Sequence, residues 1–273
     1  MTDVYRAAAV QMSSGEDVAA NLASAVHWVE QAAAAGARLV VLPELFACLG
    51  RVEAIVASAE DLPGPTSDAL CQLARRLEIT LVAGSFSERS PRPDKVYDTS
   101  LLIGSDGAVL ARYRKMHLFD VDLPGQVTLA ESRWITAGDQ VVAVSTPQGC
   151  IGQAICYDLR FPELFRQLAD AGTDVICLPS AFTLPTGRDH WEVLVRARAI
   201  ENQAFVVAAN QCGRHTPQLT TYGHSMIVDP WGTPLAVAAD GAGLAIAEID
   251  LTRMAEIRRQ LPALQHRRAR LDA

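Results

Sequence analysis

The sequence lacks the cysteine spacings that build disulfide frameworks or zinc sites. Its six cysteines lie at positions 48, 71, 150, 156, 177 and 212, and no two of them form a CxxC pair. It also has no HExxH motif and no clustered His/Cys ligand spacing. We therefore expect reduced thiols in a reducing compartment and no metal site.

Long apolar runs are missing as well. The longest, such as residues 204–209, have the length of a strand, and the N-terminal stretch MTDVYRAAAVQM carries an acid at position 3. Neither a membrane span nor a signal peptide is therefore expected. The net charge of −7 and the pI near 5.4 argue against nucleic acid or an anionic membrane surface as the main partner. These features favour a cytoplasmic protein.

Linkers, fixed-period repeats and breaks in composition do not occur either. What the 273 residues do contain is core material, since 49% are hydrophobic and 20% are charged. We predict a single domain over residues 1–273, in which residues 254–273 form a C-terminal helix and a basic tail.

Apolar strand-like runs alternate with helical patterns along the chain. Alternation of helices and strands, interleaved with hairpins, predicts an α/β fold of mixed sheets with helices packed outside. The predicted strands cover 4–12, 38–42, 80–86, 174–178 and 205–210. The predicted helices cover 17–35, 67–77, 190–203 and 253–260, and a further helix follows the turn at Cys156 and ends at about residue 171. Hairpins are predicted at 96–103/108–114 and 141–145/150–155, and near 229–232 and 239–243.

One turn stands out, in the segment GQAICYDLRFPE that begins at Gly152. Small and apolar residues run into Cys156, and Pro162 and Glu163 occupy positions typical of a helix start. This pattern predicts a thiol on a tight strand-to-helix turn, near backbone N–H groups that could hold an oxyanion. The alternative for a free cysteine is a small buried core residue.

Two further polar groups follow apolar strands, Glu44 after RLVVLP and Lys115 after ARYR. Open α/β sheets place their sites at the carboxyl ends of strands. Taken singly, Glu44 could be a helix-start acid and Lys115 a solvated strand end. Together with Cys156 they form a candidate nucleophile constellation, because a thiol needs a base and a nearby ammonium favours both thiolate and oxyanion.

A papain-like Cys-His enzyme is the alternative based on histidine. His190 and His224 are better interpreted as structural or pocket-edge residues than as a catalytic base. His117 lies two residues past Lys115, and we expect it to line the pocket. The basic tail of this acidic protein is more typical of a solvated helix face or a subunit contact than of nucleic-acid binding.

Several long segments in the same order resemble the nitrilase superfamily of carbon–nitrogen hydrolases. They are VVLPELF, YRKMHLFDVDLPG, AICYDLRFPEL, PSAFTLPTGRDHWEVLVRARAIENQ, YGHSMIVDPWG and LPALQHRR, which extend from about residue 4 to 268. More narrowly, they resemble its amidase branch, which includes the deaminated glutathione amidases and the ω-amidases. The runs that begin at Ala209 and Tyr222, and the PSAF segment, are more similar to the first of these groups.

The resemblance implies a Glu-Lys-Cys triad. In it Glu44 is the general base, Lys115 the oxyanion partner and Cys156 the nucleophile. It also implies a second active-site glutamate at Glu131. The backbone N–H of Tyr157 would be a further oxyanion donor.

Substrate contacts are implied in the same way. Arg160 and Thr186 match positions that hold an α-keto carboxylate, for which a guanidinium gives a bidentate clamp. Phe182 and His117 are the further substrate-binding candidates. Arg188 and Asp189 depart from the pattern of the animal enzymes near the expected pocket mouth, so they bear on specificity.

The resemblance implies a four-layer α-β-β-α sandwich of mixed sheets, usually a homodimer, with no organic cofactor and no metal. The implied reaction is cysteine-dependent hydrolysis of a non-peptide amide C–N bond in a small molecule through a thioester, with deaminated glutathione as the first substrate. The alternatives are an ω-amidase acting on 2-oxoglutaramate-type monoamides and a nitrilase. From another class, a non-catalytic binding protein on the same fold is disfavoured, because the acid, lysine and thiol positions are intact.

Overall fold

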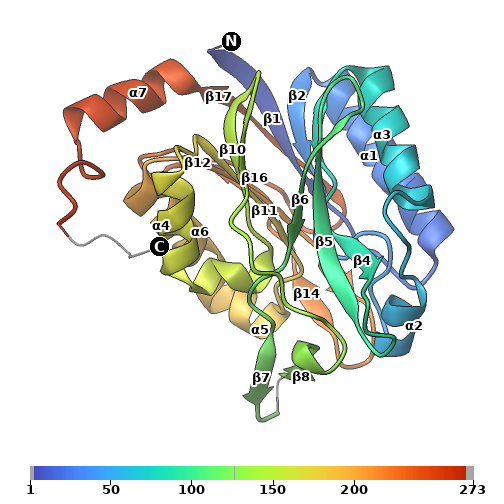
Figure 1. The fold of residues 1–273 in the computed structure, drawn as a ribbon. Helices are drawn as coiled ribbons and strands as arrows, with labels where there is room; N and C mark the ends of the chain where they lie inside the picture. The colour runs from blue at the N-terminus through green and yellow to red at the C-terminus, as the bar shows by residue number, and fades with distance from the viewer. Residues whose placement is uncertain (1–2, 126, 269–273) are drawn as a thin grey trace.

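Two mixed β-sheets face each other at the centre of the molecule, and helices cover the outer face of each (Figure 1). The computed structural model describes residues 3–125 and 127–268. The layers follow the order α-β-β-α, which is the four-layer α/β sandwich that the sequence resemblance implied.

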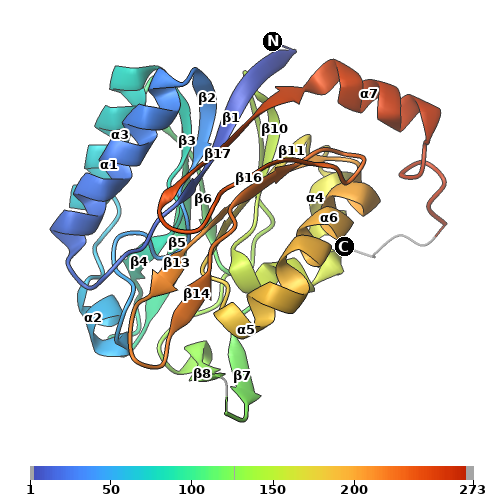
Figure 2. The same cartoon turned by 180° about the vertical axis from the view of Figure 1, so that it is seen from behind.

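The first sheet has seven strands in the order β17-β1-β2-β3-β5-β4, with β6 paired to β5. The first and last strands of the chain, β1 and β17, are antiparallel neighbours (Figure 2). The strands are β1 (Val4–Gln11), β2 (Ala37–Val41), β3 (Thr80–Val82), β4 (Phe86–Arg89), β5 (Val96–Ile103), β6 (Val109–Arg114) and β17 (Gly243–Asp250).

Two helices, α1 (Val18–Ala34) and α3 (Pro65–Leu77), pack on the outer face of the first sheet. The carboxylate of Asp17 accepts the N–H of Ala20 and so caps the start of α1. Gly36, with φ of +87°, reverses the chain into β2. The predicted helix over 17–35 is therefore confirmed to within a residue at each end. A short helix, α2 (Val52–Ala57), was not predicted.

The second sheet has six strands in the order β16-β15-β12-β11-β10-β9. Helices α4 (Pro162–Asp170) and α6 (Glu192–Asn202) cover its outer face (Figure 1). A 3-10 turn (Cys156–Arg160) precedes α4, while α5 (Leu184–Thr186) and a π-helical turn (Gly187–Trp191) precede α6. The strands are β9 (Ala143–Thr146), β10 (Gly149–Gln153), β11 (Val175–Ser180), β12 (Phe205–Asn210), β15 (Met226–Val228) and β16 (Pro234–Val237).

Three apolar layers fill the spaces between these four layers, and side chains alternate between them along each strand. On β1, Ala8 and Val10 face the helices, whereas Ala7 and Ala9 face the second sheet. The layer between the sheets is completed mainly by β2, β11 and β12. Because both faces of these strands are buried, their sequences are nearly all apolar.

The remaining elements lie outside this sandwich. Among the described residues, none of the helices has the length and apolar character needed to cross a membrane. The outlying elements are the hairpin of β7 (Asp120–Leu123) and β8 (Val127–Ala130), the 3-10 turn Glu131–Arg133, the pair β13 (Cys212–Arg214) and β14 (Thr220–Tyr222), and α7 (Leu251–Gln260).

Three sequence predictions are wrong in detail. The strand predicted over 80–86 ends at Val82, and the chain turns through Gly84 before β4 begins. The hairpin predicted near 239–243 does not form, because β16 belongs to the second sheet and β17 pairs with β1 in the first. The C-terminal helix begins at Leu251 rather than at 254, and residues 269–273 of the predicted tail lie outside the described residues.

Candidate active site

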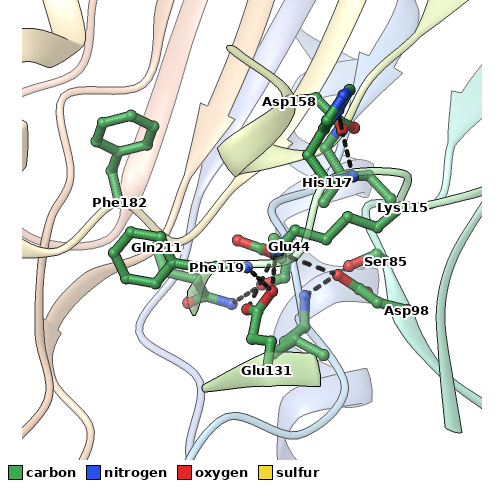
Figure 3. Close-up of polar contacts among 12 residues, drawn as sticks. Glu44, Ser85, Asp98, Lys115, His117, Phe119, Glu131, Asp158, Phe182 and Gln211 are labelled. Atoms are coloured by element: carbon green, nitrogen blue, oxygen red, sulfur yellow. Dashed lines mark hydrogen bonds and ion pairs between the residues drawn. The ribbon is translucent and has the colours of Figure 1, made fainter. Parts of the chain in front are cut away.

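Two carboxylates and one ammonium converge at one edge of the first sheet (Figure 3). Lys115, directly after β6, places its Nζ 2.7 Å from Glu44 Oε1 and 2.8 Å from Glu131 Oε2. Glu44 follows β2, and Glu131 opens the 3-10 turn after β8. The structure thus brings together three of the residues that the sequence singled out, although they come from separate segments.

The backbone around Glu44 is held in an unusual shape. Leu45 has φ of +49°, and its N–H donates to Ser85 Oγ at 3.0 Å. A Cβ on Gly84 would lie 2.2 Å from the carbonyl oxygen of Pro43, so only glycine fits beside this turn. Gln211 Nε2 also donates to the Glu44 carbonyl at 3.0 Å. These contacts fix the direction in which the Glu44 carboxylate leaves the strand end.

Lys115 is buried, with 1% of its surface exposed. Burial alone would lower the pKa of its ammonium, but the charges of Glu131 and Glu44 outweigh that effect and raise the pKa well above its ordinary value. Lys115 is therefore a permanent positive charge in a region with little water. Glu131 is fixed by a second donor, the N–H of Phe119 at 2.8 Å.

Cys156 begins the 3-10 turn that follows β10, where the sequence predicted a thiol on a strand-to-helix turn. Its φ of +44° is rare for a residue with a side chain, and such strain is typical of functional turns. Burial and the charge of Glu44 raise the pKa of the thiol well above its ordinary value, against the opposing effect of Lys115. The resting sulfur is therefore protonated, and a base must take its proton before it can act as a nucleophile.

Asp158 braces the turn that carries Cys156 against the segment that carries Lys115. Its buried carboxylate accepts the N–H of Ile155 at 2.8 Å, the hydroxyl of Tyr113 at 2.6 Å and the N–H of His117 at 3.0 Å. One side chain thus joins residues on both sides of the site. This role of Asp158 was not predicted from the sequence, although an acid two residues past a turn cysteine was the available signal.

His117 is not brought to the pocket. Its Nδ1 lies 2.7 Å from Asp158 Oδ1, and its ring stacks on Phe161 with 3.8 Å between centroids. The imidazole is thus part of the brace around Asp158 and does not line the cavity. Among the described histidines, none lines the pocket that contains Cys156, so the geometry does not support a Cys-His pair.

One cavity opens onto Cys156, Glu44 and Glu131. Tyr157, Arg160, Phe182 and Thr186 line it on the side of the second sheet, as the sequence resemblance implied. The Arg160 guanidinium carbon lies 5.2 Å from the centroid of the Phe182 ring and 5.9 Å from that of Tyr157.

No carboxylate among residues 3–125 and 127–268 pairs with Arg160, whose Nη1 instead approaches His190 Nδ1 at 3.3 Å. A guanidinium that lines a cavity and has no acidic partner in this part of the chain is available to bind a carboxylate of a ligand.

Part of the cavity wall is apolar, and this apolar wall was not predicted from the sequence. It is formed by α2 with the segment before it, by β8 with the residues after it, and by one residue near β14. Its side chains are Leu49, Val52, Ile55, Leu129, Trp134 and Leu219. These segments have no regular periodicity in the sequence, so no pattern connected them to the site.

A metal centre is not indicated. Within residues 3–125 and 127–268, no three His, Cys, Asp or Glu side chains are grouped so that they could hold a metal ion. The chemistry that the arrangement offers is that of a protonated thiol, a carboxylate base and a fixed ammonium. Such a set suits acyl transfer.

Comparison with known proteins agrees with this description. The carbon-nitrogen hydrolase family model matches residues 6–259 of the chain. The structure of Nit3 from Saccharomyces cerevisiae, described as a member of branch 10 of the nitrilase superfamily, has a TM-score of 0.87 and 33% identity. The match covers 97% of each chain. The protein belongs to the carbon–nitrogen hydrolase family of the nitrilase superfamily.

Two human relatives differ in how similar they are. The chain is 47% identical to human deaminated glutathione amidase over 96% of its own length and 81% of the relative's. It is 37% identical to human omega-amidase NIT2 over 98% of its own length and 97% of the relative's.

Proposed function

We propose that this protein hydrolyses the amide bond of deaminated glutathione through a thioester on Cys156. The observation that carries the proposal is the buried group of Glu44, Lys115 and Glu131, of which the two glutamates line the same cavity as Cys156 and Arg160. Metal and organic cofactors have no part in the proposed reaction.

In the first half of the proposed reaction, the Glu44 carboxylate takes the proton of the Cys156 thiol. The thiolate attacks the amide carbon and forms a C–S bond, while the carbonyl electron pair moves to oxygen. Lys115 and the backbone N–H of Tyr157 stabilise that oxyanion. The C–N bond then breaks, and the amine leaves with the proton from Glu44.

In the second half, Glu44 takes a proton from a water molecule that attacks the thioester carbon. The tetrahedral oxyanion forms against the same donors, and its collapse breaks the C–S bond. The sulfur leaves as the thiol with the proton held by Glu44, and the acid is released. Glu131 keeps Lys115 in place throughout, because it accepts two hydrogen bonds from Nζ.

The choice of substrate rests on two observations. The relative named for deaminated glutathione is 47% identical to the chain, against 37% for the one named omega-amidase. In addition, the Arg160 guanidinium lines the cavity beside Thr186, where it would clamp the carboxylate of an α-keto acid. The apolar wall across the cavity would then face the amine side of the substrate.

A panel assay tests this proposal. Released amine is measured with deaminated glutathione, 2-oxoglutaramate, simple aliphatic amides and the matching nitriles. We expect the highest kcat/KM for deaminated glutathione and no ammonia from nitriles. A higher kcat/KM for 2-oxoglutaramate would instead identify an ω-amidase, and nitrile turnover would identify a nitrilase. Binding of these ligands without turnover would leave a non-catalytic binding protein.

We also propose that the protein is a cytoplasmic homodimer. Its six cysteines are all free thiols, as suits a reducing compartment. Val193 and Ile200 on α6 and Trp231 in the β15–β16 turn are large apolar side chains that are at least half exposed. A second copy that packs on this face would cover them. Sedimentation equilibrium at micromolar concentration should give twice the mass of the chain, and a single-chain mass would contradict the dimer.

A further inference from the structure

A third carboxylate, Asp98 on β5, lies behind Lys115 and away from the cavity. It is buried with 1% of its surface exposed, and its Oδ2 is 4.0 Å from Lys115 Nζ. Figure 3 shows Glu44, Glu131 and Asp98 around the one ammonium. Asp98 is absent from the residues that line the cavity, so a substrate in the cavity would not touch it.

The three carboxylates do not contact the ammonium equally. Glu44 and Glu131 accept hydrogen bonds from Nζ at 2.7 and 2.8 Å. Neither oxygen of Asp98 has a partner of good hydrogen-bond geometry among the described residues. An ionised carboxylate that is buried without a hydrogen-bond partner would carry a large desolvation cost.

The charges of the group also do not balance. Three ionised carboxylates and one ammonium would leave a net charge of −2 in a space that excludes water. Besides Glu44, Glu131 and Lys115, the titratable group that interacts with Asp98 is the Tyr113 hydroxyl, which adds no positive charge. A buried group of this kind lowers its energy by keeping a proton.

We propose that Asp98 holds a proton in the working enzyme, and that its neutrality reserves the Lys115 ammonium for the two glutamates and for negative charge that develops at Cys156. Asp98 is thus a positioning residue that acts through Lys115. Burial and the charge of Glu44 raise the pKa of this carboxyl well above its ordinary value. The Lys115 charge and the nearby Ser85 hydroxyl, which makes no hydrogen bond of good geometry with Asp98, oppose this shift and have smaller effects.

The role of the proton follows from electrostatics. An ionised Asp98 would compete for the positive charge of Lys115 and would oppose formation of the thiolate and the oxyanion. A neutral Asp98 does neither. The activity part of this inference rests on the proposed amide hydrolysis, whereas the protonation itself can be measured without any substrate.

Infrared difference spectroscopy at pH 7 tests the proton directly. The spectrum of the wild type minus that of Asp98→Asn should contain the carbonyl stretch of a carboxylic acid, and this band should shift in D₂O. Glu131→Gln is the matched control, because it also removes one carboxylate next to Lys115. The acid band should persist in Glu131→Gln. If the band is missing from the wild type, or is lost in Glu131→Gln and kept in Asp98→Asn, the proposal is overturned.

Thermal unfolding gives a second readout that needs no turnover. An unfolded aspartate has a pKa of about 3.9. The stability that neutral Asp98 contributes is therefore complete below about pH 3.9 and is lost as the pH rises toward its higher folded pKa. An asparagine does not titrate, so the stability of Asp98→Asn should not fall with pH in this way. Its melting temperature should therefore exceed that of the wild type at pH 7, and the difference should shrink toward pH 4. A lower melting temperature at pH 7 would mean that the ionised carboxylate stabilises the fold.

Activity gives the third readout. Asp98→Asn should keep at least about a third of the wild-type kcat, since an amide replaces a neutral acid of nearly the same shape. Glu131→Gln should lose about a hundredfold, since it removes a carboxylate that accepts two hydrogen bonds from Lys115. A hundredfold loss in Asp98→Asn with normal folding would show that the charge is required. Failure of every amide substrate with the wild type would refute the proposed function and leave the infrared and thermal results standing.

Discussion

The two sheets contribute to the site in different ways. The first sheet supplies Glu44 and Lys115, which are charged and at most 2% exposed. The second sheet supplies the Cys156 turn, Arg160 and Thr186, which all line the cavity. The first sheet therefore supplies the buried charges, of which Glu44 also reaches the cavity, and the second sheet supplies the nucleophile and most of the side chains proposed to bind the substrate.

This difference separates the effects of substitution. Fixed charges act most strongly where water is excluded and reorganisation is small, so changes on the first sheet should lower kcat. Changes on the second sheet should raise KM, except at the nucleophile and at its brace.

Cys156→Ala should lower amide hydrolysis by more than about 10⁴-fold, since it removes the group that forms the covalent intermediate. Its melting temperature should stay close to that of the wild type, because the thiol is small. The measurement is amine release at saturating substrate. Wild-type turnover in this variant would mean that another group attacks the amide.

Glu44→Gln and Lys115→Ala should each lower kcat by about 10²-fold or more, because each removes an acid–base or electrostatic element. KM should change much less than kcat. Glu78→Gln, at an exposed helix end, is the control and should behave as the wild type. If either site variant changed KM and left kcat unchanged, the first sheet would act in substrate binding rather than in the chemical step.

Arg160→Ala should raise KM for α-keto acid amides by about tenfold to a hundredfold, the effect of losing a charge-assisted hydrogen bond. The kcat should remain near that of the wild type. Arg253→Ala on α7 is a control of the same charge, because this exposed residue is not among those that line the cavity. An unchanged KM in Arg160→Ala would remove Arg160 from the substrate site.

Asp158→Asn should lower kcat by about tenfold with little change in KM. The amide accepts fewer of the three donors from Ile155, Tyr113 and His117, so the Cys156 turn shifts slightly relative to Lys115. The pH dependence of kcat should keep its shape, because the reacting groups are unchanged. A loss confined to thermal stability would make Asp158 a folding residue only.

Much of the fold follows from hydrophobic periodicity. The central strands of both sheets and helices α1, α3 and α6 appear where apolar spacing predicts them, because each buries one or both faces. The turn near 239–243 was predicted wrongly for a physical reason. A Gly/Asp turn has the same local sequence whether the next strand pairs back or crosses to the other sheet.

The candidate site residues that could be predicted from the sequence are those that follow the end of a strand. Glu44 and Lys115 meet because two strand ends share one sheet edge, and that rule needs only the sequence. Asp98 could not be found in this way, since an acid in the run VYDTSLLI resembles a solvated strand residue until its surroundings are known. The apolar wall was missed because its side chains come from short segments whose own patterns are irregular.

The apolar wall lies outside the layers that hold the sheets together. Leu49, Val52 and Ile55 belong to α2 and the segment before it, and Leu129 and Trp134 lie in and after β8. Leu49, Val52, Ile55 and Trp134 pack in a cluster separate from the three apolar layers of the sandwich, so evolution can alter them with less effect on the packing of the sheets. New substrate preferences would arise on this wall, while the reaction itself is inherited unchanged.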